Sequence, residues 1–173
     1  YAAKGNLIKW NPAVKTAADR DALRAGLLDG AVDVVATDHA PHTLEEKERP
    51  YASAPSGGPL VQHSLPMMLE LSAQGVLPVE TIVEKMCHAP ARLFGVRDRG
   101  FLRTGHFADI VLVRPADPWT VSKENILYKC GWSPLEGTAF SHRIVRTLVN
   151  GRTVYADGRV DTTHRGAELE FDR

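Results

Sequence analysis

Cysteine is scarce in this chain of 173 residues, which contains only Cys87 and Cys130. The two form neither a Cys-x-x-Cys pair nor the paired spacing of a zinc finger. A disulfide scaffold and a cysteine-based zinc module are therefore excluded. We expect two reduced, buried thiols, as is usual in cytoplasmic proteins.

Long apolar runs and an excess of either charge are also missing. No run approaches the roughly 20 residues that a membrane-spanning helix needs, and no signal-peptide pattern opens the sequence. Basic and acidic residues number 21 each, without a basic stripe, which argues against binding to nucleic acid or to a membrane surface. The 43% hydrophobic and 24% charged residues are typical of a soluble globular protein, so we expect a cytoplasmic one. Since the chain opens at Tyr1 without a methionine, we expect it to begin inside a longer protein.

The first part of the chain has the alternation of a βαβ unit. Residues 7–10 and 32–37 are short apolar runs typical of strands, and leucines at helical spacing lie between them. Thr16, with Asp19 three residues later, predicts a capping box at the start of this helix, and Gly30 predicts its end. The pattern favours an α/β fold with buried parallel strands.

The chain changes character after Gly95. Before it, the apolar spacing predicts helices at 64–74 and 79–94. After it, the sequence is β-rich, and strands are predicted at 108–113, 144–149 and 152–155, the last two joined by the hairpin signal Asn150-Gly151. We therefore predict three parts: an α/β part at 1–98, a β-rich part at 99–160, and a polar tail at 161–173 that frays.

Asp38 is the most informative residue because it directly follows the apolar run at 32–37. In α/β barrels, functional side chains lie at the C-terminal ends of the strands. His39 and His42 follow, and a carboxylate together with imidazoles suits a zinc ion. Such a carboxylate can also accept a proton from a metal-bound hydroxide. The competing interpretation is that Asp38 caps a turn and that both histidines are structural, and spacing alone does not decide between the two.

A long polar stretch runs from Thr43 to Pro59. A loop of this length is uncommon in a compact domain unless it is functional. Its charged run, residues 45–49, is most simply a solvated loop, and the alternative is a mobile lid over the site.

Several of these stretches resemble dihydroorotases of the amidohydrolase superfamily. They occur in the expected order, and the resemblance covers residues from about 5 to 160. The most specific stretch is similar to the family's motif after the last barrel strand: Val35-Ala36-Thr37-Asp38-His39-Ala40-Pro41-His42. The others are Lys9-Trp10-Asn11-Pro12, Ala54-Pro55-Ser56-Gly57, Cys87-His88-Ala89-Pro90-Ala91-Arg92-Leu93-Phe94-Gly95 and Gly105-His106-Phe107-Ala108-Asp109-Ile110-Val111.

The resemblance implies a fold and a set of roles. Residues 1–98 would be the last two strands and helices of a metal-dependent (β/α)8 barrel, and 99–160 part of an outer β-rich domain. Asp38 would be both the metal-associated carboxylate and the general base and acid. Asn11 and His42 would hold the substrate carboxylate, and backbone groups around Gly57 would contact the ring. The reaction would be reversible hydrolysis of dihydroorotate to N-carbamoyl-aspartate in pyrimidine biosynthesis. No role for His39 follows from the resemblance.

The chain also departs from the family. The family's remaining metal ligands, a His-x-His pair, a carboxylated lysine and further histidines, lie on strands that have no counterpart in this sequence. Because a zinc site needs at least three protein ligands, we expect zinc only in the complete protein, joined with the missing N-terminal half of the barrel. The resemblance further implies a homodimer and possibly a partner, aspartate transcarbamoylase. Two alternatives stay open: a related hydantoinase or allantoinase, and a non-catalytic scaffold for aspartate transcarbamoylase.

Overall fold

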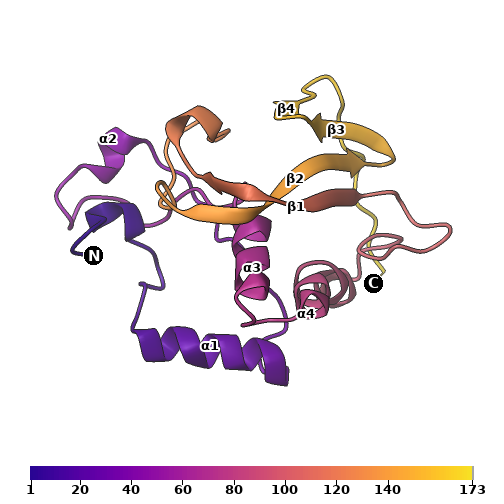
Figure 1. The fold of residues 1–173 in the computed structure, drawn as a ribbon, viewed down its shortest axis with the longest axis horizontal. Helices are drawn as coiled ribbons and strands as arrows, with labels where there is room; N and C mark the ends of the chain where they lie inside the picture. Colours follow the sequence, from indigo (N-terminus) through magenta and orange to yellow (C-terminus); the bar gives the residue numbers. More distant parts are fainter. Residues whose placement is uncertain (173) are drawn as a thin grey trace.

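An antiparallel sheet lies over a layer of helices in the computed structural model, which describes residues 1–172 (Figure 1). Arg173, the last residue of the predicted tail, lies outside the described residues. The helices are η1 (Gly5–Ile8, 3-10), α1 (Ala17–Asp29), α2 (Leu44–Lys47), α3 (Ser64–Ala73), α4 (Val79–Val83), η2 (Glu84–His88, π), α5 (Ala89–Phe94) and η3 (Lys123–Asn125, 3-10). The strands are β1 (Ile110–Thr120), β2 (Ala139–Val149), β3 (Arg152–Ala156) and β4 (Arg159–Val160), paired in that order.

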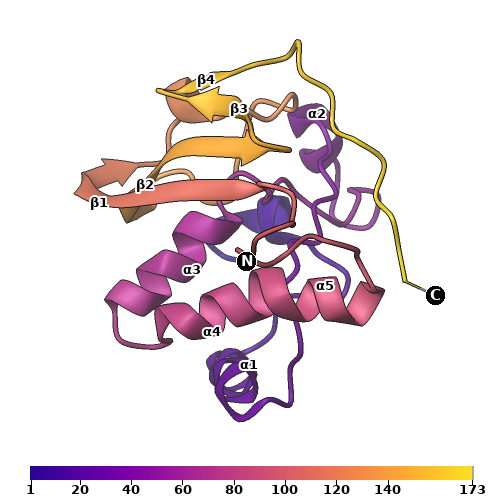
Figure 2. The same cartoon turned by 90° about the vertical axis from the view of Figure 1, so that its right-hand side faces the viewer.

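The core forms where α3 and α4 meet beneath the sheet (Figure 2). Its buried members are Met68, Leu69, Leu77 and Ile82, and α1 contributes the partly buried Leu27. Helix α1 lies farther from the sheet than α3 does (Figures 1 and 2). Two of its leucines face solvent, Leu23 with 62% and Leu28 with 55% of their surface exposed. Burial of α1 is therefore incomplete within the described residues.

The predicted helix boundaries are confirmed by their caps. Thr16 and Asp19 form the reciprocal capping box at the start of α1, and Gly30 ends the helix in the left-handed conformation at φ 89°. The predicted helix at 79–94 is continuous but contains the π-helical turn η2 between α4 and α5. It ends at Gly95 with φ 62°, where glycine avoids the steric cost of a Cβ.

The predictions of strands at 7–10 and 32–37 were wrong. Residues 5–8 form the 3-10 helix η1, and residues 32–37 belong to no strand. A strand exists only when a neighbouring strand completes its hydrogen-bond ladder, and the described residues offer none beside either segment. The βαβ unit is therefore not formed, although the fold is α/β with an antiparallel sheet.

The β-rich region has the predicted hairpin. Asn150 and Gly151 join β2 to β3 with φ values of 52° and 78°, as expected for a tight turn of this sequence. The sheet is longer than predicted, because β1 pairs with β2 from Ile110 to Thr120, with irregularities in register on the way. The Glu70 carboxylate of α3 accepts hydrogen bonds from the Ser141 N–H at 2.9 Å and hydroxyl at 2.8 Å, which fixes this helix to β2.

Two further predictions need correction. The tail does not fray throughout, because Val96 and Phe171 form an antiparallel bridge and Arg97 pairs with Glu170. Both thiols are free, but Cys87 is exposed, so the prediction of two buried thiols was wrong. Within the described chain, no helix has the length and apolar character needed to cross a membrane.

Candidate active site

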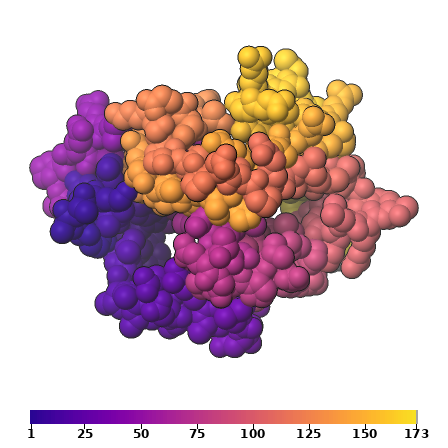
Figure 3. Space-filling view, in the orientation of Figure 1, coloured from indigo at the N-terminus to yellow at the C-terminus, as the bar shows by residue number. Residues whose placement is uncertain are grey.

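The predicted site residues come from three segments that meet at one end of the molecule. In Figure 3 the indigo N-terminal residues lie beside the purple residues around α2. The Asn6 side chain fixes this arrangement by donating to the carbonyl oxygens of Lys47 at 2.9 Å and Arg49 at 2.7 Å. Segment 9–12, segment 38–47 and segment 54–58 therefore converge, although the sequence separates them.

Asp38 lies in an exposed position with φ 45°, in the left-handed region that non-glycine residues rarely adopt. The segment before it is held by η2 instead of a sheet. The Val35 N–H donates to the Lys85 carbonyl at 3.0 Å, and the Lys85 ammonium donates to the Val32 carbonyl. These contacts fix the direction in which the chain enters Asp38.

His39 connects the Asp38 segment to the loop that follows Gly57. Its Nδ1 atom accepts backbone N–H groups of Leu60 at 3.1 Å and Val61 at 3.3 Å. Its backbone also forms an isolated parallel bridge with Gly58. The imidazole therefore ties the two segments together, a role that the sequence did not indicate.

Tyr128 packs against His39, with ring centroids 5.5 Å apart, and extends the connection into the β-rich region. Its hydroxyl accepts the Gln62 N–H at 3.0 Å and lies 3.1 Å from His63 Nδ1. Burial raises the pKa of Tyr128 to about 12 and lowers the pKa of His63. At neutral pH the Tyr128 hydroxyl is therefore protonated, and it can donate a hydrogen bond to the uncharged His63 imidazole.

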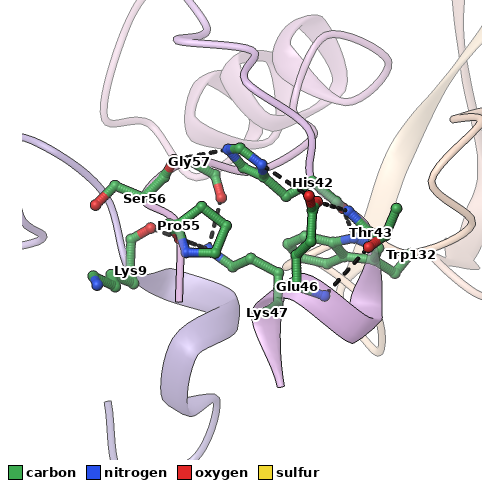
Figure 4. A network of polar contacts seen from close by, with 9 residues as sticks. All are labelled: Lys9, His42, Thr43, Glu46, Lys47, Pro55, Ser56, Gly57 and Trp132. Carbon is green, nitrogen blue, oxygen red and sulfur yellow. Dashed lines mark hydrogen bonds and ion pairs between the residues drawn. The ribbon is translucent and has the colours of Figure 1, made fainter. Parts of the chain in front are cut away.

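His42 is engaged on both sides of its ring (Figure 4). Its Nε2 atom donates to the Ser56 carbonyl at 3.1 Å, and its Nδ1 atom lies 3.5 Å from the Glu46 carboxylate. Its own carbonyl accepts the indole N–H of the buried Trp132 at 2.7 Å. The His42 side chain remains 31% exposed and borders a cleft of about 390 Å³ whose lining also includes His39, Glu46 and Tyr128.

Gly57 is buried beside Ala40, with φ 113°. A Cβ atom here would lie 2.7 Å from the Ala40 carbonyl oxygen, so both the conformation and the close approach require glycine. The Gly57 N–H donates to the Lys9 carbonyl at 2.9 Å. The structure therefore brings Gly57 and, through Ser56, His42 into one cluster.

Asn11 and Asp38 adjoin this cluster through their chain neighbours. Asn11 is exposed and follows Lys9 by two residues, and a cis peptide bond joins it to Pro12. Among residues 1–172, no hydrogen bond or ion pair connects the Asn11 or Asp38 side chain to His42 or Gly57. The roles assigned to all four residues remain predictions.

Lys47 was missed by the sequence reasoning, which placed it in a solvated charged run. It is 1% exposed, and its ammonium donates to the carbonyl oxygens of Gly57 at 2.8 Å, Pro55 at 2.9 Å and Lys9 at 3.3 Å. Burial, and secondarily the nearby Lys9, lowers the pKa of Lys47. The capping box of Thr43 and Glu46 stabilises the start of the short helix α2, but no local pattern marks Lys47 as buried.

The described residues do not supply a complete metal centre. No group of three or more His, Cys, Asp or Glu side chains in residues 1–172 is placed to hold a metal ion. A zinc site needs at least three protein ligands, so Asp38 fits only as one ligand of a site completed from elsewhere.

Comparison with known proteins assigns the family. The model of the amidohydrolase family matches residues 6–154. This chain belongs to the amidohydrolase family. A dihydroorotase of Pelobacter propionicus is 42% identical over 147 residues, covering 85% of this chain and 34% of that protein. A dihydroorotase of Halobacterium salinarum is 38% identical over 151 residues, covering 87% of this chain and 36% of that protein.

Solved structures of hydantoinases have the same fold over the matched region. An L-hydantoinase (dihydropyrimidinase) from Arthrobacter aurescens matches with a TM-score of 0.85 and 32% identity, over 92% of this chain and 37% of that one. A D-hydantoinase matches with a TM-score of 0.83 at 22% identity, which concerns the fold alone. The chain thus spans about a third of the length of these relatives.

Proposed function

We propose that this chain is part of a dihydroorotase, which hydrolyses the cyclic amide of dihydroorotate reversibly to N-carbamoyl-aspartate. The observation that carries the proposal is the convergence of His42 and Gly57 next to the segment that bears Asp38. Relatives named dihydroorotase at up to 42% identity support it. Residues 1–98 would then contribute to the barrel, and 99–160 to the outer β-rich domain.

In this proposal Asp38 moves the proton. Its carboxylate accepts a proton from the attacking water while the oxygen bonds to the ring carbonyl carbon. It returns that proton to the ring nitrogen as the carbon–nitrogen bond breaks. The exposed position of Asp38 leaves its carboxylate open to such a partner.

His42 and Asn11 would recognise the substrate carboxylate. An imidazole N–H bonded to a carboxylate is a charge-assisted hydrogen bond, among the stronger ones that proteins form. Backbone groups around Gly57 would contact the ring, because the absence of a side chain there permits close approach.

Zinc is the metal we propose for the complete protein. Members of the family are generally metal-dependent, and Asp38 offers a carboxylate oxygen suited to zinc. The other ligands would come from outside the described residues, so no step of the reaction is assigned to the metal. We also propose a homodimer; aspartate transcarbamoylase is retained only as a candidate partner.

A hydantoinase is the second candidate, because the structural relatives include proteins of that name. The proposed carboxylate-binding pair favours dihydroorotate, since hydantoins need carry no such group. A non-catalytic scaffold is the third candidate. Turnover by the complete protein would exclude it, and an inactive complete protein would favour it.

The test is a direct assay of the complete purified protein with dihydroorotate, carbamoyl-aspartate and unsubstituted hydantoin. We expect turnover of the first two and at least tenfold lower kcat/KM for hydantoin. Asp38→Asn keeps the shape of the side chain but cannot accept the proton, so kcat should fall by about 10²- to 10⁴-fold. Turnover of hydantoin in preference to dihydroorotate, or an Asp38→Asn variant with more than about a tenth of wild-type kcat, contradicts the proposal.

A further inference from the structure

Lys47 is an unusual group to find buried. Lysine is almost never fully buried unless it is paired, because desolvation of the ammonium costs more than most contacts return. No carboxylate pairs with this one in the described structure; three backbone carbonyls accept its hydrogen bonds instead. Three acceptors match the three N–H donors of an ammonium, so the group is satisfied although it is out of water.

The three carbonyls belong to two segments that carry predicted substrate contacts. One is Lys9, two residues before Asn11, and the others are Pro55 and Gly57 itself. The Lys9 carbonyl also accepts the Gly57 N–H, so the ammonium closes a small network around that contact. Removal of the ammonium takes one donor from each of these carbonyls, and the Lys9 carbonyl keeps the Gly57 N–H.

The helix that carries Lys47 is itself joined to His42. Helix α2 begins after Thr43, whose side chain and N–H form a capping box with Glu46, and Glu46 faces the His42 ring. Figure 4 shows the Lys47 side chain extending from α2 toward Lys9 and Pro55, with the His42 ring above it. One side chain thus connects the segments of all three predicted substrate-binding residues.

We propose that Lys47 is a positioning residue that holds segments 9–12 and 55–57 at the distance at which Asn11, His42 and Gly57 contact one substrate molecule. The residue itself does not touch the substrate. The inference rests on the proposed function, because it concerns the residues to which substrate binding was assigned.

The alternative is that Lys47 serves the stability of the fold alone. Stability would change in any variant that empties this position. A positioning role predicts in addition a selective rise in KM, because misplaced contacts weaken binding of the substrate, and faster exchange of the Gly57 amide, whose acceptor is Lys9.

The experiment compares Lys47→Met with Lys47→Ala in the complete protein. Methionine fills most of the space without donors, and alanine leaves room for propylammonium, which supplies the missing carbons and the ammonium. Lys123→Met, at an exposed lysine outside the cluster, is the matched control. KM, kcat, bound zinc and hydrogen exchange of the peptide containing Gly57 are measured for each, with and without propylammonium.

We expect KM for dihydroorotate to rise roughly 10- to 100-fold in Lys47→Met, with kcat and zinc content within a few-fold of wild type. Exchange at Gly57 should accelerate, and propylammonium should restore KM in Lys47→Ala. A folded Lys47→Met with wild-type KM and exchange overturns the inference. So does a pair of variants that fail to fold and are not recovered by the amine, because that result assigns Lys47 to folding alone.

The controls separate this inference from the proposed function. Wild-type protein without activity on dihydroorotate contradicts the function, whereas the exchange measurement still tests whether Lys47 holds the loop. Active wild-type protein with an unchanged Lys47→Met contradicts only the inference.

Discussion

Replacement of His42 by alanine in the complete protein should weaken binding of dihydroorotate. In the structure one ring nitrogen donates to Ser56 and the other faces Glu46 at 3.5 Å. The substrate carboxylate would therefore replace Glu46 at Nδ1, which can donate to it when both ring nitrogens carry a proton, while the Nε2–H bond to Ser56 keeps the ring in place. The 3.5 Å contact is long for a charge-assisted hydrogen bond, so a well-placed substrate carboxylate should bind better than Glu46 does.

The expected magnitude follows from that exchange of partners. A charge-assisted hydrogen bond is worth about 1.5–3 kcal/mol, which corresponds to roughly 10- to 150-fold in affinity. Because the free enzyme gives up its contact with Glu46, we expect the lower part of this range, about 10- to 30-fold in KM. A metal ligand would behave differently, since its loss would remove zinc and lower kcat first.

The assay measures KM, kcat and zinc content of His42→Ala with dihydroorotate and with a ring analogue that lacks the carboxylate. Glu46→Gln is a useful companion, because its amide oxygen can still accept the Thr43 N–H while the competing charge is gone. Glu46→Gln alone should lower KM slightly, and it should have no effect on KM when His42 is already alanine. Equal damage to both substrates, or loss of zinc in His42→Ala, refutes the reasoning.

Three further outcomes are expected. The 173-residue chain dialysed alone should retain far less than one zinc per chain by elemental analysis, since residues 1–172 place no group of three potential ligands together; stoichiometric zinc lost in Asp38→Ala would contradict this. Trp132→Phe should lower the free energy of unfolding by about 1–3 kcal/mol in urea titrations, because the partly buried His42 carbonyl loses its donor. Ser141 holds the pKa of Glu70 below its usual range, first through its N–H and then its hydroxyl, so this stabilisation is complete above about pH 4.3 and is lost as the pH falls through the lower folded pKa. Melting temperatures of wild type and Glu70→Gln should therefore converge on acidification, and a constant difference would count against the assignment.

Features with a local cause were predictable from the sequence. The capping box of Thr16, the left-handed glycines at helix ends and the Asn150-Gly151 hairpin depend on residues within a few positions of one another. Propensity and short hydrogen bonds decide them before the chain is packed. The motif from Asp38 to His42 likewise indicated the family, because its residues are contiguous and can be recognised without the fold.

Features that depend on distant partners were decided only by the tertiary structure. Residues 32–37 have the composition of a buried strand, but a strand also needs neighbours, and the described chain holds them through Lys85 instead. The tail pairs with Arg97 although its own sequence is polar. In both cases the partner lies far along the chain, where no local pattern reports it.

The same distinction separates the candidate site from its support. The sequence by itself indicated where to expect chemistry, at Asp38 and His42, because carboxylate and imidazole side chains are chemically conspicuous. Only the tertiary structure showed that Lys47 is buried and that His39 accepts two backbone N–H groups. A lysine in a charged run looks solvated until three carbonyls from other segments surround it, and that arrangement exists only once the chain has folded.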